Sequence, residues 1–121
     1  MVSKVPPELL IGSVVYRVIS DPILFALKEG DEECKGAYGF TTAMKATIHL
    51  NPDQSPDNQR LTLWHEIMHA LAESVMGNPH WDNLGENPVE REEKIIRLLE
   101  SPTLLVLRNN PLLVKYLMGG S

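Results

Sequence analysis

The segment His65-Glu66-Ile67-Met68-His69 contains the residue types and the spacing of a hydrolytic metal site. Residues four apart lie on one face of an α-helix, so His65 and His69 can present imidazole nitrogens to a single ion. Glu66 is turned by roughly 100° from His65 on a helix, which keeps its carboxylate off the metal but close to a water molecule bound there. The spacing therefore predicts a Zn²⁺ site with His65 and His69 as ligands and Glu66 as the general base.

The flanking sequence predicts the helix that must carry this motif. Ser55-Pro56-Asp57 supplies an N-cap serine, a proline for the first helical position and an acid for the first turn, and Gly77-Asn78-Pro79 supplies a stop signal. The side opposite the histidines carries mainly apolar or small side chains, at Leu63, Ile67, Ala70, Leu71, Ser74 and Val75. We expect this back face to be buried and the histidines to lie at the front. The alternative interpretation is an ordinary amphipathic helix with two surface histidines.

A catalytic zinc ion normally has three protein ligands, so another part of the chain must supply one more. Glu92 is the first candidate, because it shares a stripe with Val89, Ile95, Ile96 and Leu99 on a predicted helix over residues 89–99. That stripe is expected to face inward, and an inward carboxylate needs a partner. The alternatives left open are Glu93, His80, Glu90 and Glu86. Cys34 has acidic neighbours and is expected to be a loop thiol.

The remaining elements follow from local patterns. Residues 3–12 are expected to be an irregular lead-in, residues 13–19 a strand, and residues 23–27 a short strand or a helical turn. Two more strands are predicted at 36–42 and 46–50, and the second is expected to offer an open edge to an extended peptide, with His49 pointing to solvent. Ser101-Pro102 is expected to interrupt the later helix, before helical pieces at 103–108 and 112–118. The predicted fold class is α+β, with a small N-terminal sheet packed on the motif helix and C-terminal helices.

Composition limits the possible functions. The chain has 121 residues, which predicts a single domain over residues 1–121, and its net charge of −5 argues against a nucleic-acid partner. No apolar run is long enough to span a membrane, and the N-terminus does not resemble a signal peptide. With the single cysteine Cys34 there is no intrachain disulfide to form, so a cytoplasmic location is expected.

Taken together, these segments resemble small phage- and prophage-encoded zinc metallopeptidase-like proteins, which are minimal zincins of the ImmA/IrrE or gluzincin type. The resemblance is carried by residues 65–71, the acidic helix at 90–96 and the tail at 107–117, and it extends over residues 36–118. It implies a small mixed sheet, a helix with two histidine ligands and a second helix with a glutamate ligand. The sequence departs from gluzincins at Ile96, where they place a polar or acidic residue.

These observations predict a zinc-dependent metallopeptidase whose partner is a peptide or protein substrate, with a phage- or host-derived protein as the class that the resemblance suggests. Tyr38, His80 and Tyr116 are the candidates for stabilising the oxyanion of the reaction. One rival is a zinc-stabilised regulatory or interaction module that cleaves little. A second rival is a metal-free helical interaction protein, which a chelator would not destabilise.

Overall fold

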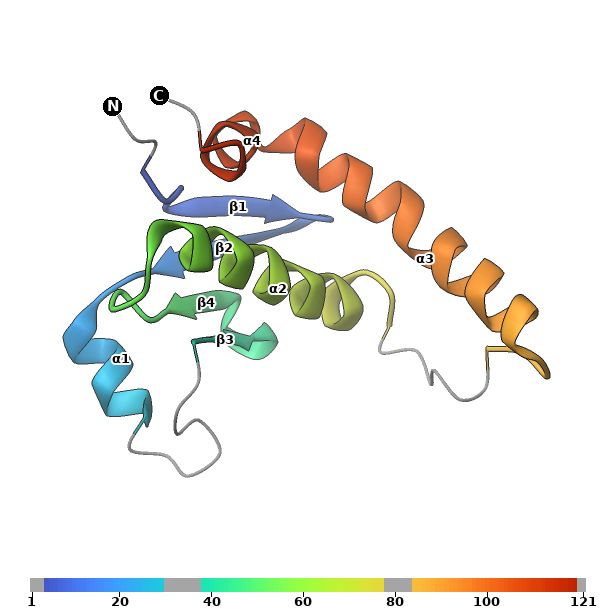
Figure 1. Ribbon diagram of the computed structural model, residues 1–121, viewed down its shortest axis with the longest axis horizontal. Helices are drawn as coiled ribbons and strands as arrows, with labels where there is room; N and C mark the ends of the chain where they lie inside the picture. The colour runs from blue at the N-terminus through green and yellow to red at the C-terminus, as the bar shows by residue number, and fades with distance from the viewer. Residues whose placement is uncertain (1–3, 30–37, 78–83, 120–121) are drawn as a thin grey trace.

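A four-stranded sheet forms the base of the molecule (Figure 1). The structure is a computed structural model that describes residues 4–29, 38–77 and 84–119. The strands are β1 (Glu8–Ile11), β2 (Val14–Ile19), β3 (Gly39–Thr42) and β4 (Thr47–Leu50), in the spatial order β1-β2-β4-β3. β2 and β4 are parallel, and the two outer pairs are antiparallel. The mixed sheet and its helices confirm the predicted α+β class.

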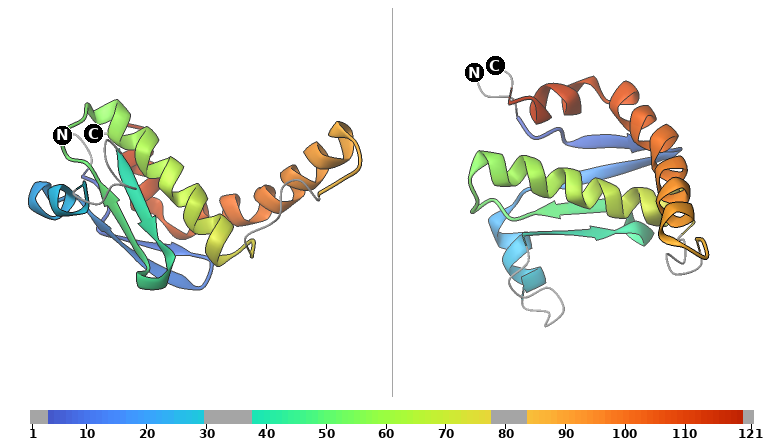
Figure 2. Two further views of the ribbon diagram at one scale, coloured as in Figure 1. Left: turned by 90° about the horizontal axis from the view of Figure 1, so that it is seen from below. Right: turned by 45° about the vertical axis from the view of Figure 1, so that its right-hand side comes forward.

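The helices are α1 (Pro22–Glu29), α2 (Pro56–Ser74), α3 (Pro88–Asn109) and α4 (Pro111–Leu117), with a short 3₁₀ turn, η2, at Ala43–Lys45. Helix α2 lies along one face of the sheet in all views (Figures 1 and 2). Between them lies the hydrophobic core, which also includes side chains of α3 and α4: Leu9, Ile11, Tyr16, Ile48, Leu50, Leu63, Ile67, Ala70, Leu71, Val106, Leu113 and Tyr116. The core therefore fixes α2, the helix with the motif, against the sheet.

The two edges of the sheet differ. At β1, the side-chain amide of Asn110 accepts a hydrogen bond from the Leu10 N–H and donates one to the Leu10 carbonyl, each at 2.8 Å. Asn110 thus pairs with this edge as a neighbouring strand would. Within the described residues, β3 pairs only with β4, and its other edge is open. The prediction that the strand before the motif helix is the open one is wrong, because β4 is internal, between β2 and β3.

Two further local expectations are corrected and an open alternative is decided. The lead-in contains a strand, β1, which pairs with β2 directly after the Pro6-Pro7 segment. Residues 22–29 form a helix, which resolves the alternative left open for that segment. His49 is buried, not solvent-exposed. β4 is an internal strand, and Phe40, the register partner of His49 on β3, stacks on Phe25 of α1 on that face of the sheet.

Helix α3 runs without a break from residue 88 to residue 109, so the prediction that Ser101-Pro102 interrupts it is wrong. The Thr103 hydroxyl, directly after the proline, donates to the Leu99 carbonyl inside the helix. The first half of α3 extends away from the sheet and α2 (Figures 1 and 2). As a result Val89 and Glu92 are exposed, and the expectation of an inward stripe at this end is wrong.

Candidate metal centre

Helix α2 begins and packs as its sequence predicts. Ser55 caps it by accepting a hydrogen bond from the Asn58 N–H at 3.2 Å, and Pro56 occupies the first turn. Four of the six predicted back-face residues are buried, namely Leu63, Ile67, Ala70 and Leu71, whereas Ser74 and Val75 near the end are exposed. Because that face is held in the core, His65 and His69 are turned outward.

The two histidines face a common point. Their Nε2 atoms lie 3.2 Å apart. With Zn–N bonds of about 2.0–2.1 Å and tetrahedral angles, two nitrogens on one zinc ion are about 3.4 Å apart. The separation of the two Nε2 atoms therefore matches that of two ligands on one zinc ion. Both side chains are exposed, so an ion can reach them from solvent.

Glu66 lies beside this pair but is buried, with only 6% of the residue exposed. Its Oε1 accepts a hydrogen bond from the Thr41 hydroxyl of β3 at 2.8 Å. Its Oε2 lies 4.0 Å from His65 Nε2. One carboxylate oxygen is thus fixed to the sheet and the other points toward the histidines, which is the orientation that a base acting on a water molecule next to them requires.

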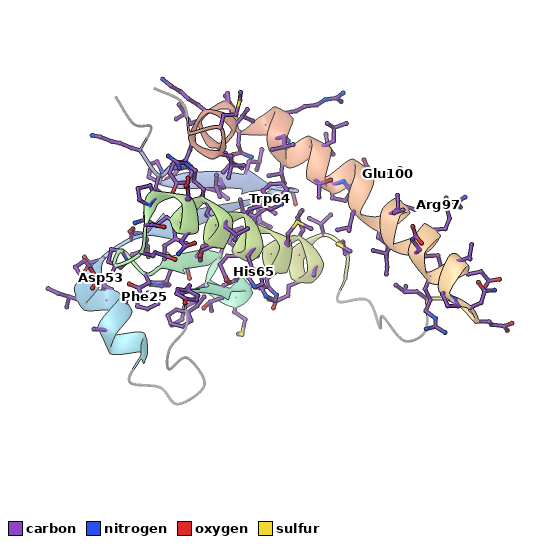
Figure 3. All side chains as sticks on the ribbon, in the orientation of Figure 1. Phe25, Asp53, Trp64, His65, Arg97 and Glu100 are labelled. Carbon is purple, nitrogen blue, oxygen red and sulfur yellow. The ribbon has the colours of Figure 1, made fainter. Side chains whose placement is uncertain are left out.

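Two hollows flank His65, which lies at the front of α2 (Figure 3). A cavity of about 340 Å³ lies toward β3 and is lined by Tyr38, Gly39, Leu61, Thr62, His65 and Glu66. A second cavity of about 280 Å³ lies toward α3 and is lined by His65, Met68, His69, Ala72, Met76 and Leu99. A chain bound across the histidines would therefore have room for a side chain on either side.

The third predicted ligand is not next to the pair in this arrangement. Glu92 is exposed on the outer part of α3, and the described residues contain no group of three His, Cys, Asp or Glu side chains that could hold a metal ion. Of the alternatives, Glu93 pairs with Arg97 at 3.1 Å and Glu90 accepts a hydrogen bond from the Glu86 N–H at 3.0 Å. Figure 3 places Arg97 on the projecting half of α3. His80 and Cys34 lie outside the described residues.

Of the candidates for stabilising the oxyanion, Tyr38 and Tyr116 are described by the structure, and they lie in different places. Tyr38 lines the same cavity as His65 and Glu66 and is exposed. Tyr116 lies in the core, only 4% exposed, and lines neither of the two cavities that contain His65. Burial raises the pKa of the Tyr116 phenol, against a smaller opposing effect of Arg60. Tyr38 is therefore the described candidate that lies within the site.

The two residues of β3 that lie against Glu66, Gly39 and Thr41, were not predicted from the sequence. They lie two apart on β3 and so face α2 on the same side of the sheet. No motif marks either one, and only the pairing of β3 next to α2 brings them to Glu66. The glycine is the one signal that was present, since a glycine inside a strand often marks a close approach of another element.

A helix with a paired-histidine motif, packed on a small mixed sheet, defines a zincin-like protein. More specifically, the chain belongs to the peptidase M78 family of IrrE N-terminal-like domains, because the sequence model of that family matches residues 25–105. This confirms the ImmA/IrrE-type resemblance and indicates a metallopeptidase-like role. No curated protein and no solved structure matches the chain. No helix among the described residues has the length and apolar character needed to cross a membrane.

Proposed function

We propose that this protein is a zinc-dependent peptidase in which His65 and His69 bind the metal and Glu66 is the general base. The observation that carries the proposal is the 3.2 Å separation of the two Nε2 atoms beside a buried, oriented carboxylate. The two histidines are exposed and do not belong to the buried face that packs α2 against the sheet, so the packing of the helix does not require them. Membership of the peptidase M78 family supports the same assignment.

The chemistry follows from the positions of the side chains. When bound, zinc would acidify a water molecule and polarise a peptide carbonyl. Glu66 would accept the proton of the attacking water through Oε2 and then deliver it to the departing amine. Tyr38, in the same cavity, would donate a hydrogen bond to the carbonyl oxygen as it gains negative charge.

Glu92 is proposed as the third protein ligand. It precedes Leu99 by seven residues, or two helical turns, so both lie on one face of α3, about 10 Å apart along the axis. Leu99 lines the cavity that contains both histidines. Glu92 would therefore reach the ion if the projecting half of α3 moved toward α2. Measuring the zinc affinity of Glu92→Gln and Glu93→Gln tests this choice. Glu92→Gln should bind zinc more weakly than the wild type, whereas Glu93→Gln should bind it with the wild-type affinity.

The open edge of β3 supports a way of binding the substrate. The Tyr38 carbonyl accepts a hydrogen bond from the Asn51 N–H at 2.9 Å, on the β4 side. Since backbone groups alternate in direction along a strand, those of Gly39 and Thr41 face the open edge. An extended peptide would add to this edge as a further strand, with its side chains entering the two cavities. The apolar lining by Leu61 on one side and Met68 and Met76 on the other favours apolar side chains.

The proposal is tested with purified protein, its Glu66→Gln variant and a peptide library. The wild type should contain zinc and cleave a subset of peptides, while Glu66→Gln should retain zinc and lose cleavage. Equal turnover by both proteins on a cleaved peptide would refute the role of Glu66. Zinc binding with stability that depends on the metal, but without turnover on any peptide, would instead support a zinc-stabilised interaction module.

A further inference from the structure

The side chain of Thr41 holds the carboxylate of Glu66 from the sheet. Thr41 Oγ1 lies 2.8 Å from Glu66 Oε1 and 3.0 Å from the Glu66 carbonyl oxygen. A hydroxyl has a single proton to donate, and an ionised carboxylate is the stronger acceptor of the two. We propose that Thr41 is a positioning residue, which fixes Oε1 so that Oε2 is directed toward the histidines. This inference rests on the proposed function, in which Glu66 is the base.

Gly39 lies against the aliphatic part of the Glu66 side chain. A Cβ atom added at Gly39 would lie 3.3 Å from Glu66 Cγ and 2.9 Å from Thr62 Cγ2. The absence of a side chain at this position lets α2 approach β3 closely. The stem of Glu66 therefore lies against Gly39 and its head is bound by Thr41, which leaves the carboxylate little freedom to rotate.

The hydrogen bond from the Thr41 hydroxyl matters because the Glu66 carboxylate is buried. The Glu66 side chain is only 8% exposed, so water satisfies little of its hydrogen-bonding capacity. Without the Thr41 hydroxyl, Oε1 would turn toward solvent or toward His65 to regain a partner. A misplacement of about 1 Å at a reacting group can lower the rate by about 100-fold. The effect should fall on the chemical step rather than on substrate binding, since Oε1 contacts the protein.

The test compares three variants in the zinc-loaded protein. Thr41→Val keeps the shape and removes the hydroxyl, and Thr41→Ser keeps the hydroxyl. Thr42→Val is the matched control, because the next residue on β3 points to the other face of the sheet. For Thr41→Val we expect a kcat lowered by about 10- to 100-fold with KM and zinc content unchanged. Thr41→Ser and Thr42→Val should retain turnover close to that of the wild type.

An unchanged kcat in Thr41→Val, or an equal loss in Thr41→Ser, would overturn the proposal. A structural readout keeps it testable even if no substrate is cleaved. In crystal structures of the zinc-loaded wild type and Thr41→Val, the Glu66 carboxylate should occupy its present place only in the former. Finding it unmoved in Thr41→Val would also overturn the assignment. Failure of the proposed function is separate, since it would appear as full activity of Glu66→Gln or as absence of turnover in the wild type.

Discussion

Gly39→Ala should destabilise the protein because α2 lies too close to β3 to accept a methyl group there. The added Cβ would lie 2.9 Å from the His49 carbonyl oxygen, 2.9 Å from Thr62 Cγ2 and 3.3 Å from Glu66 Cγ. The first of these atoms is backbone of the neighbouring strand, and the other two are one turn apart on α2. Relief therefore requires a shift of the helix as a unit rather than a rotation of one side chain.

Such overpacking costs about 1–3 kcal/mol. At about 4 °C per kcal/mol for a chain of this size, the Tm should fall by about 4–12 °C. Thermal unfolding followed by circular dichroism, with and without zinc, measures this shift. Because α2 also carries the histidines, zinc affinity should fall together with stability.

Thr62→Ser supplies the control for Gly39→Ala. Serine lacks the Cγ2 methyl but keeps the hydroxyl that donates to Gln54 Oε1 at 3.1 Å. If contact with α2 causes the loss, the double variant Gly39→Ala/Thr62→Ser should be more stable than the sum of the two single changes predicts. A Tm of Gly39→Ala within about 1 °C of the wild type would refute the close approach of α2 to β3.

Three further changes test other parts of the structure. Asn110→Ala should cost about 1–3 kcal/mol in urea unfolding, because it leaves the N–H and carbonyl of Leu10 without their partner, and an unchanged midpoint would contradict this pairing. Pro102→Ala should stabilise the protein by up to about 3 kcal/mol, since a mid-helix proline removes a hydrogen bond, whereas unchanged or lower stability would contradict a cost of the proline to α3. Tyr116→Phe should unfold at the same Tm or higher, because the buried phenol has no hydrogen-bond partner within the described residues. Burial raises the folded-state pKa of Tyr116 above its ordinary value of 10.0, so wild-type stability should be intact below that pH and fall above it, and this alkaline loss should be smaller in Tyr116→Phe.

Helix α2 could be predicted from the sequence because its signals are local. The cap at Ser55, the proline after it and the apolar back face all lie within one segment, and the structure contains each of them. The spacing of His65 and His69 likewise depends only on helix geometry. For the same reason, the strands on either side of the 43–45 turn were predictable from residue type.

The features that were missed depend on contacts between distant segments. The order β1-β2-β4-β3 decides that His49 is buried and that β3, rather than β4, has the open edge. A strand's place in its sheet has no local signal. Glu92 was expected to face inward but is exposed, because the first half of α3 projects beyond the sheet and α2. The periodicity of a helix predicts which residues share a face, but it does not predict which part of that face packs against another element.

The most direct test of the proposed metal centre is X-ray absorption spectroscopy of the zinc-loaded protein, combined with its zinc content. We expect one zinc ion per chain, with two imidazole nitrogens among its ligands, and loss of the ion in both His65→Ala and His69→Ala. Glu66→Gln should retain the same coordination, since its carboxylate is not a ligand. Zinc absent from the wild type, or bound equally well after both histidine substitutions, would contradict the central claim.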